Sequence, residues 1–278
     1  MSTYRSFVFW AVGIAVVLIP FGLFVLLGWP GAADSCTTAS PDTCYCEAFT
    51  PADVATGNGG VRQPSNTWFN LYAIGTSFLV AMVVFFDRRG SRGEAPIQST
   101  GLIPDAYVLA VLFLGLGSMW FHASLKAWAG NIDGLSMYVY AGFLVFYTVR
   151  RLWASDVFFW TAYPATVAAF TTIGAVWQWE YKSAVLIAVL VVAYLALEIG
   201  CWYRQGTILM GRTRPRVLWG CAVGAIVVAT VFWLLSQTGG PLCDPASWAQ
   251  PHGLLWHPLA GLMAVLLYFY WREEKLVA

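Results

Sequence analysis

The sequence predicts an all-α, polytopic membrane helical bundle with a seven-helix core and one extra N-terminal helix, which makes 8 transmembrane helices in total. Three observations support this prediction. Hydrophobic residues make up 59% of the 278 residues and charged residues only 10%, whereas soluble domains carry about 25% charged residues. The apolar residues gather in runs of about twenty, the length that crosses a bilayer as a helix. Lys and Arg alternate between charge-rich and charge-poor connecting loops.

The apolar runs define eight predicted spans: 7–28, 67–86, 104–124, 132–149, 157–177, 183–203, 217–236 and 253–271. The first run resembles a signal peptide in following Arg5, but its apolar core of about 22 residues is longer than the roughly 7–15 residues of a signal sequence. We therefore expect a retained helix. The chain then divides into an additional N-terminal transmembrane helix (1–30), an extracytoplasmic loop (31–66) and a seven-transmembrane catalytic core (67–278).

The positive charges predict the orientation, because cytoplasmic loops of membrane proteins carry an excess of Lys and Arg. With a cytosolic N-terminus, only Arg62, Lys126 and Lys182 would face outward. The cytosolic side would hold the remaining cations, Arg5, Arg88, Arg89, Arg92, Arg150, Arg151, Arg204, Arg212, Arg214, Arg216, Arg272 and Lys275. Both termini are therefore expected in the cytosol. The net charge of +1 gives no indication of a nucleic-acid partner.

Four of the six cysteines lie in predicted outer loops. Cys36, Cys44 and Cys46 precede the second span, and Cys243 precedes the last. In an oxidising compartment such cysteines form disulfides, and we expect the pairs Cys36–Cys44 and Cys46–Cys243. A small thiolate metal site is the alternative.

Four ionisable residues, three histidines and Asp133, are predicted to meet at the outer leaflet, with Ser118 one turn below His122. Ser118 and His122 are four apart near the outer end of the third span, so a helix places them on one face. Asp133 follows at the start of the fourth span, and His252 and His257 open the last one. Each such histidine taken alone could simply bond a neighbouring helix. Ionisable groups inside a membrane cost roughly 2.5–3.5 kcal/mol each, and a metal ion is the simplest common partner for this set.

The spacing of the last two histidines requires an irregular helix. Residues five apart point about 140° away from each other on a regular α-helix. Pro258 cannot hydrogen-bond back to Leu254 and crowds its carbonyl. We therefore expect either a π-like widening or a pre-helical His252, and either would bring both rings to one metal.

These residue types suit zinc-dependent hydrolysis. Zinc held by three histidines, here His122, His252 and His257, keeps an open position for water and lowers its pKa to about 7. In this scheme the zinc-bound water is the nucleophile. Asp133 shuttles its proton to the leaving group, and Ser118 donates a hydrogen bond to the oxyanion. The substrate would be a lipid amide or ester at the outer leaflet.

Two acidic residues lie at the other end of the spans. Asp105 is near the inner start of the third span and Glu198 near the inner end of the sixth. We expect both to be interhelical hydrogen-bond or Arg partners, with a proton or ion path as the alternative.

The site residues also resemble a known family. Gly-Ser-Met-Trp-Phe-His-Ala-Ser-Leu at 117–125, Asp133 and Trp256-His257 resemble the alkaline ceramidases, part of the superfamily of seven-helix membrane metal hydrolases with the progestin/adipoQ receptors and Per1-like proteins. Cys46-Glu47 and the Asn-Thr-Trp-Phe-Asn run at 66–70 are similar to the family's Cys-Glu and Asn-Thr-x-x-Asn motifs. The resemblance spans residues 44–271 and leaves the first span as an addition.

The resemblance implies a hydrolase acting on carbon-nitrogen bonds in linear amides, which converts ceramide and water to sphingoid base and fatty acid at an intramembrane Zn2+ site. Ser118, His122, Asp133 and His257 match directly, whereas the family spaces its last two histidines by four residues. The implied partner is a membrane lipid, ceramide or another N-acyl lipid. The family also has a calcium site, which we expect to be weakened or absent here, because only Glu47 of its acidic surroundings is kept.

Two other classes of protein remain open. A seven-helix receptor-like protein with a structural metal site would bind a lipid without turnover. A transporter is suggested by the two acidic residues within the spans, but the sequence has no paired Gly- or Pro-broken helices and no inverted repeat of the kind that transporters show.

Overall fold

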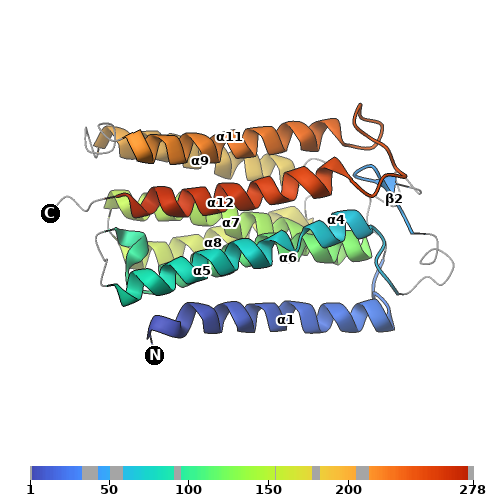
Figure 1. Ribbon diagram of the computed structural model, residues 1–278, viewed down its shortest axis with the longest axis horizontal. Helices are drawn as coiled ribbons and strands as arrows, with labels where there is room; N and C mark the ends of the chain where they lie inside the picture. Colours follow the sequence, from blue (N-terminus) through green and yellow to red (C-terminus); the bar gives the residue numbers. More distant parts are fainter. Residues whose placement is uncertain are drawn as a thin grey trace.

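The computed structural model describes residues 2–32, 43–50, 59–90, 95–153, 155–176, 182–204 and 213–274. Long helices run side by side along one axis (Figure 1). The helices are α1 (Arg5–Leu27), α4 (Pro64–Phe69), α5 (Tyr72–Arg89), α6 (Ile103–Ser124), α7 (Ala127–Trp153), α8 (Asp156–Val176), α9 (Lys182–Arg204), α11 (Thr213–Leu235) and α12 (His257–Arg272), with 3₁₀ turns η1 (Ser2–Tyr4) and η2 (Pro96–Gln98) and a π-helix η3 (His252–Trp256). The strands β1 (Thr43–Cys44) and β2 (Glu47–Ala48) form one antiparallel hairpin.

The all-α membrane bundle predicted from the sequence is confirmed. Within the described ranges, 7 helical segments are long and apolar enough to cross a membrane. The fifth predicted span, 157–177, corresponds to α8, which has 21 residues but is not among these seven, because Thr, Tyr and Pro164 interrupt its apolar run. The start of α1 and the end of α12 lie at the same end of the bundle (Figure 1). This arrangement fits an even number of crossings, and the exact count stays a prediction.

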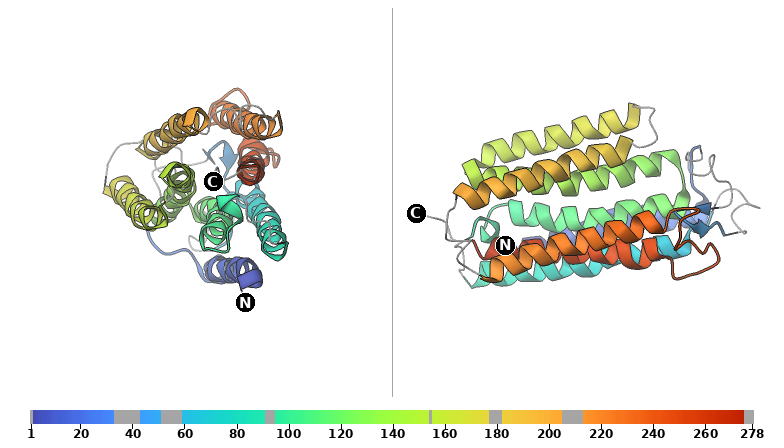
Figure 2. Two further views of the ribbon diagram at one scale, coloured as in Figure 1. Left: turned by 90° about the vertical axis from the view of Figure 1, so that its left-hand side faces the viewer. Right: turned by 90° about the horizontal axis from the view of Figure 1, so that it is seen from above.

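The extra helix α1 lies on the outside of the bundle. Viewed from one end, α1 lies outside the group formed by the other long helices, and it packs mainly against α5 and α6 (Figure 2). Trp10 Nε1 donates to Ser77 Oγ on α5 at 3.1 Å. Near the other end, Trp29 forms edge contacts with Phe21 and with Trp120 of α6, and the Phe21 ring lies tilted against Trp120. Helix α1 is thus fastened to α5 near its start and, near its end, to α6, the helix that carries His122.

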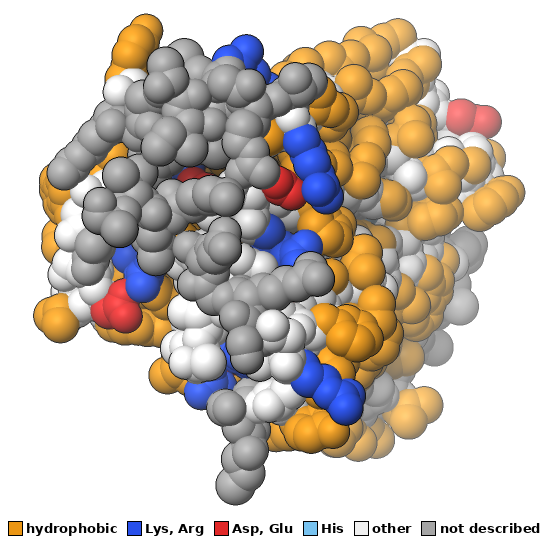
Figure 3. All heavy atoms as spheres, turned by 60° about the vertical axis from the view of Figure 1, so that its left-hand side comes forward, with side chains coloured by type: hydrophobic (Ala, Val, Ile, Leu, Met, Phe, Trp, Pro, Cys, Tyr) orange, Lys and Arg blue, Asp and Glu red, His pale blue; other side chains and the backbone are white. Residues whose placement is uncertain are grey.

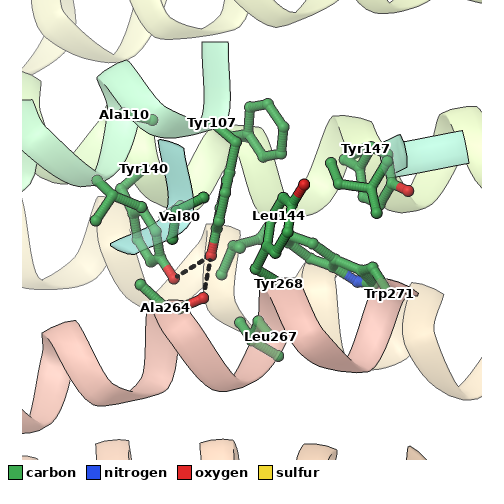
Figure 4. Close-up of a cluster of buried hydrophobic side chains, with 14 of the residues drawn as sticks. Val80, Tyr107, Ala110, Tyr140, Leu144, Tyr147, Ala264, Leu267, Tyr268 and Trp271 are labelled. Carbon is green, nitrogen blue, oxygen red and sulfur yellow. Dashed lines mark hydrogen bonds between the residues drawn. The ribbon is translucent and has the colours of Figure 1, made fainter. Parts of the chain in front are cut away.

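A buried aromatic cluster joins α6, α7 and α12 (Figure 4). The hydroxyl of Tyr107 donates to the backbone oxygen of Ala264 at 2.7 Å and lies 3.3 Å from the hydroxyl of Tyr140. Trp271 packs edge-on against Tyr107 at 5.2 Å and lies 4.7 Å from the ring of Tyr147. The three helices that carry His122, Asp133 and His257 are therefore held in a fixed arrangement.

The two acidic residues within the spans, Asp105 and Glu198, are paired with arginines, as expected. Arg5 and Arg88 both bond the carboxylate of Asp105, at 2.7 and 2.9 Å. Arg151 bonds Glu198 at 2.6 Å, and Tyr270 also donates to that carboxylate. These buried pairs satisfy charges that would otherwise be costly, so they need no ion path to explain them.

The charged end of the molecule is visible on its surface. Figure 3 brings forward the end that carries both chain termini, where Lys, Arg, Asp and Glu side chains gather, while hydrophobic side chains cover the flank. This pattern fits a helical bundle whose sides face lipid. Of the predicted cytosolic cations, Arg92, Arg212 and Lys275 lie outside the described residues.

The predicted disulfide between Cys46 and Cys243 is confirmed. It joins the hairpin turn to the loop between α11 and η3, and it removes Cys46 from the alternative thiolate metal site. Cys36 and the side chain of Cys44 lie outside the described residues, so their predicted pairing stays a prediction.

Candidate metal centre

Three buried histidines converge at the end of the bundle opposite the two chain ends (Figure 1). His122 lies in the last turn of α6, His252 opens the π-helix η3, and His257 opens α12. Their exposed fractions are 1%, 3% and 3%. One nitrogen from each ring lies within 4.8 Å of the other two, a group that can hold a metal ion.

The π-helix brings His252 and His257 together. Its backbone runs from His252 to Trp256, and Pro258 follows in the first turn of α12. Because a π-helix bonds residue i to residue i+5, two residues five apart come to lie one above the other. The centroids of the two rings are 4.8 Å apart. Of the two irregularities expected from the spacing, a π-like widening or a pre-helical His252, the structure contains the π-like widening.

The hydrogen bonds of His122 leave its Nε2 atom directed at His252. Gln63 Oε1 lies 2.8 Å from His122 Nδ1. Gln63 Nε2 donates to the backbone oxygen of Glu47 at 3.2 Å, which fixes the orientation of the amide. An amide oxygen only accepts hydrogen bonds, so His122 carries its proton on Nδ1 and a lone pair on Nε2.

The distance between the two facing nitrogens fits a shared metal ion. His122 Nε2 and His252 Nε2 are 3.3 Å apart. Two ligands with Zn–N bonds of about 2.0–2.1 Å in a tetrahedral site lie about 3.3–3.4 Å apart. His252 Nδ1 is buried without a hydrogen-bond partner among the described residues. The donor set and its spacing are therefore compatible with zinc, although the structure does not identify the metal.

His257 is supported by α4, α5 and the residues between them. Asn70 Nδ2 lies 3.2 Å from His257 Nε2 and also donates to the backbone oxygen of Asn66 at 2.8 Å. The ring of Tyr72 stacks on His257 with centroids 6.2 Å apart. The sequence pointed to Asn66 and Asn70 only through the family motif, and the structure gives Asn70 a direct contact with the site.

Ser118 and Asp133 lie around the histidines in different ways. Ser118 is buried one turn before His122 on the same face of α6. Helix α7 begins at Ala127, earlier than the predicted span, so half-buried Asp133 lies nearly two turns into it. Asp133 is not part of the three-histidine group, but it lies within electrostatic range of Tyr72. The catalytic roles of both residues stay predictions.

A glycine lets α6 and α7 approach closely at this level. A Cβ atom at Gly117 would lie 2.6 Å from Ser136 Cβ, closer than real Cβ contacts allow. Ser136 is one turn beyond Asp133 along α7. The glycine therefore keeps the helix that carries Ser118 and His122 against the helix that carries Asp133.

Glu47 has a structural task beside the site. Its two carboxylate oxygens accept the backbone N–H groups of Ser65 and Asn66 at 2.6 and 2.8 Å. Burial raises the pKa of Glu47 to about 7, although these two hydrogen bonds oppose the rise. The carboxylate thus fixes the start of α4, which leads to Asn70.

Two residues that contact the histidines could not be identified from the sequence. Gln63 and Tyr45 lie outside the predicted spans and carry no motif that links them to a histidine. The ring of Tyr45 stacks on His252 with centroids 4.8 Å apart. Both contacts depend on how the segments that precede α4 fold over the helix ends.

Replacing Gln63 with leucine is expected to weaken metal binding about 10- to 100-fold, the usual loss when a residue that orients a metal-ligating histidine is removed. Leucine keeps the volume but cannot accept the Nδ1 proton of His122. The measurement is a cobalt or zinc titration of purified protein. Gln98→Leu, which removes a buried glutamine far from the histidines, should bind metal as the wild type does. Equal affinity in the two variants would contradict the orienting role.

Comparison with protein-family models finds no match for this chain, and comparison with curated proteins finds none either. The likeness to alkaline ceramidases is thus carried by the motif residues alone. A function has to be inferred from the chemistry of the site.

Proposed function

We propose that this protein is a zinc-dependent intramembrane lipid amide hydrolase of the ceramidase type, which hydrolyses ceramide to sphingoid base and fatty acid. The observation that carries the proposal is the buried group of His122, His252 and His257 at one end of a membrane bundle. Imidazole ligands in a set of three are typical of catalytic zinc, which keeps a fourth position open.

The residues around the histidines have separate tasks in this proposal. Zinc supplies Lewis acidity and activates water at neutral pH. Gln63 and Asn70 orient two of the ligand rings through the hydrogen bonds described above. Ser118 donates a hydrogen bond from its hydroxyl to the oxygen that gains negative charge in the transition state. Asp133 accepts a proton from the attacking water and passes it to the nitrogen of the leaving amine.

The position of the site supports a lipid substrate. The histidines open or close helices of membrane-spanning length, so they lie near the level where acyl chains meet head groups. The amide of an N-acyl lipid lies at that same boundary. The distribution of Lys and Arg favours the extracytoplasmic leaflet for the site and the cytosol for both termini.

The decisive assay measures fatty acid released from an N-acyl sphingoid lipid by protein purified in detergent, with and without a metal chelator. A hydrolase releases fatty acid, loses this activity with chelator and regains it with added zinc. A receptor-like protein with a structural metal binds the lipid and releases nothing. Binding without release from the metal-loaded wild type would therefore favour the second function.

Replacing Ser118 with alanine is expected to leave metal content unchanged and to slow turnover about 10²- to 10³-fold, the usual effect of removing one oxyanion donor. The measurements are metal content and fatty acid release. Ser124→Ala is the matched control, because Ser124 lies on the same helix and donates to the backbone oxygen of Trp120 instead. Loss of metal in Ser118→Ala would make Ser118 a structural support of the ligands.

A further inference from the structure

The turn of the β-hairpin has an unfavourable backbone conformation. Cys44 pairs with Glu47, so the turn consists of two residues, Tyr45 and Cys46. Their φ angles are +48° and +70°. Two-residue turns with both φ values positive normally contain Asn and Gly, because other side chains collide with the backbone there. Such a conformation persists only where its surroundings hold it, and it is common at functional sites.

Several contacts hold this turn in place. Cys46 is fully buried and forms the disulfide with Cys243. Its backbone N–H donates to Thr238 Oγ1 at 3.2 Å, and that of Ala48 donates to the backbone oxygen of Pro245, also at 3.2 Å. The hairpin is thereby fixed to the loop that leads into η3 and His252.

The held turn places the ring of Tyr45 against two of the three histidines. It stacks on His252, with centroids 4.8 Å apart and planes 28° apart. It also packs edge-on against His122, at 5.4 Å and 72°. One aromatic ring therefore contacts the two imidazoles whose Nε2 atoms face each other.

The Tyr45 ring can fix the orientation of the His252 ring, as hydrogen bonds fix the orientation of the other two histidine rings. A metal-ligating histidine normally bonds a partner through its second ring nitrogen, which fixes the orientation of the ring. Gln63 lies beside the second nitrogen of His122, and Asn70 lies beside the ring of His257. His252 Nδ1 has no hydrogen-bond partner among the described residues, so its ring is oriented by stacking.

We propose that Tyr45 is a positioning residue of the metal centre, and that the Cys46–Cys243 disulfide holds it against His252. This inference rests on the proposed metal site. When a dithiol reductant opens the disulfide, two thiols form and the reductant becomes a cyclic disulfide. The turn then relaxes, the Tyr45 ring leaves His252, and the three histidines bind metal more weakly.

The test is a cobalt titration of full-length protein in detergent, followed by the visible d–d absorption of the bound ion. Tyr45→Ala is expected to bind cobalt about 10- to 100-fold more weakly than the wild type, with an altered d–d spectrum. Tyr45→Phe keeps the stacking ring and is expected to have the cobalt affinity and the d–d spectrum of the wild type. Tyr203→Ala removes a tyrosine that is 77% exposed on α9 and serves as the control without effect.

A second arm of the experiment tests the role of the disulfide, and the reductant is removed before the titration so that it cannot bind the metal. Wild type is reduced with dithiothreitol, alkylated with iodoacetamide, desalted and then titrated. The expected affinity is about as low as that of Tyr45→Ala, and Cys46→Ser/Cys243→Ser should match it. This arm also decides the matter if Tyr45→Ala fails to fold.

The outcomes separate the two proposals. Wild type that binds no cobalt overturns the metal site and with it the role of Tyr45. Wild type that binds cobalt, with Tyr45→Ala and the reduced protein binding equally well, overturns only the positioning role. Weak binding in Tyr45→Phe as well as in Tyr45→Ala would also overturn it, because the stacking ring is then not what matters.

Discussion

Replacing His122 with alanine is expected to remove the bound metal and abolish turnover, and His257→Ala is expected to do the same. Each change removes one imidazole from a buried group of three whose donor atoms lie within 4.8 Å of one another. Two remaining ligands cannot complete a catalytic zinc site, which uses three protein ligands. Metal content should fall from near one ion per chain to near zero, as measured by elemental analysis, and fatty acid release should fall below detection.

A folding control is needed because both side chains are buried. Each variant should unfold cooperatively on heating and, before heating, should elute from size-exclusion chromatography at the volume of the folded wild type. Retained zinc with a normal rate in either variant would remove that histidine from the site.

The second large effect is expected for Asp133→Asn. Asparagine keeps the size of the side chain but cannot take up a proton, so turnover should fall about 10²- to 10⁴-fold, the usual contribution of a general acid or base. Metal content should stay unchanged, because Asp133 is not part of the three-histidine group. The measurements are fatty acid release and elemental analysis on the same preparation.

Asp244→Asn is the matched control for this change. Asp244 is an exposed residue of the loop between α11 and η3, and its carboxylate accepts a hydrogen bond from the backbone N–H of Ala246. Its substitution should leave turnover unchanged. An Asp133→Asn variant with the wild-type rate would mean that another group carries the proton, and one without metal would mean that Asp133 supports the ligands.

Local patterns in the sequence were sufficient to predict the helices and the convergence of the three histidines. Apolar runs of membrane length and the alternation of charge placed His122, His252 and His257 at one depth. The five-residue spacing together with Pro258 predicted the π-helical widening that the structure contains. These features depend on helix geometry and bilayer thickness, which act over a few residues or along one span.

The supports of the site could not be predicted in the same way. Gln63 and Tyr45 reach His122 and His252 because a hairpin, a disulfide and a short helix fold over the ends of the bundle. Neither residue has a periodicity or a spacing that shows such contacts. Helix α7 is also longer than the predicted span 132–149. Leu125 has a left-handed backbone, with φ +50°, and this turn lets α7 begin only two residues later, at Ala127.

The most direct test is elemental analysis of detergent-purified wild type alongside His252→Ala. The proposed site predicts near one zinc per wild-type chain and a loss of that zinc in the variant, because the π-helix brings His252 to the other two ligands. Wild-type protein that carries no zinc, and takes up none when it is supplied, would contradict the proposed metal centre. Zinc retained in the variant would exclude His252 as a ligand.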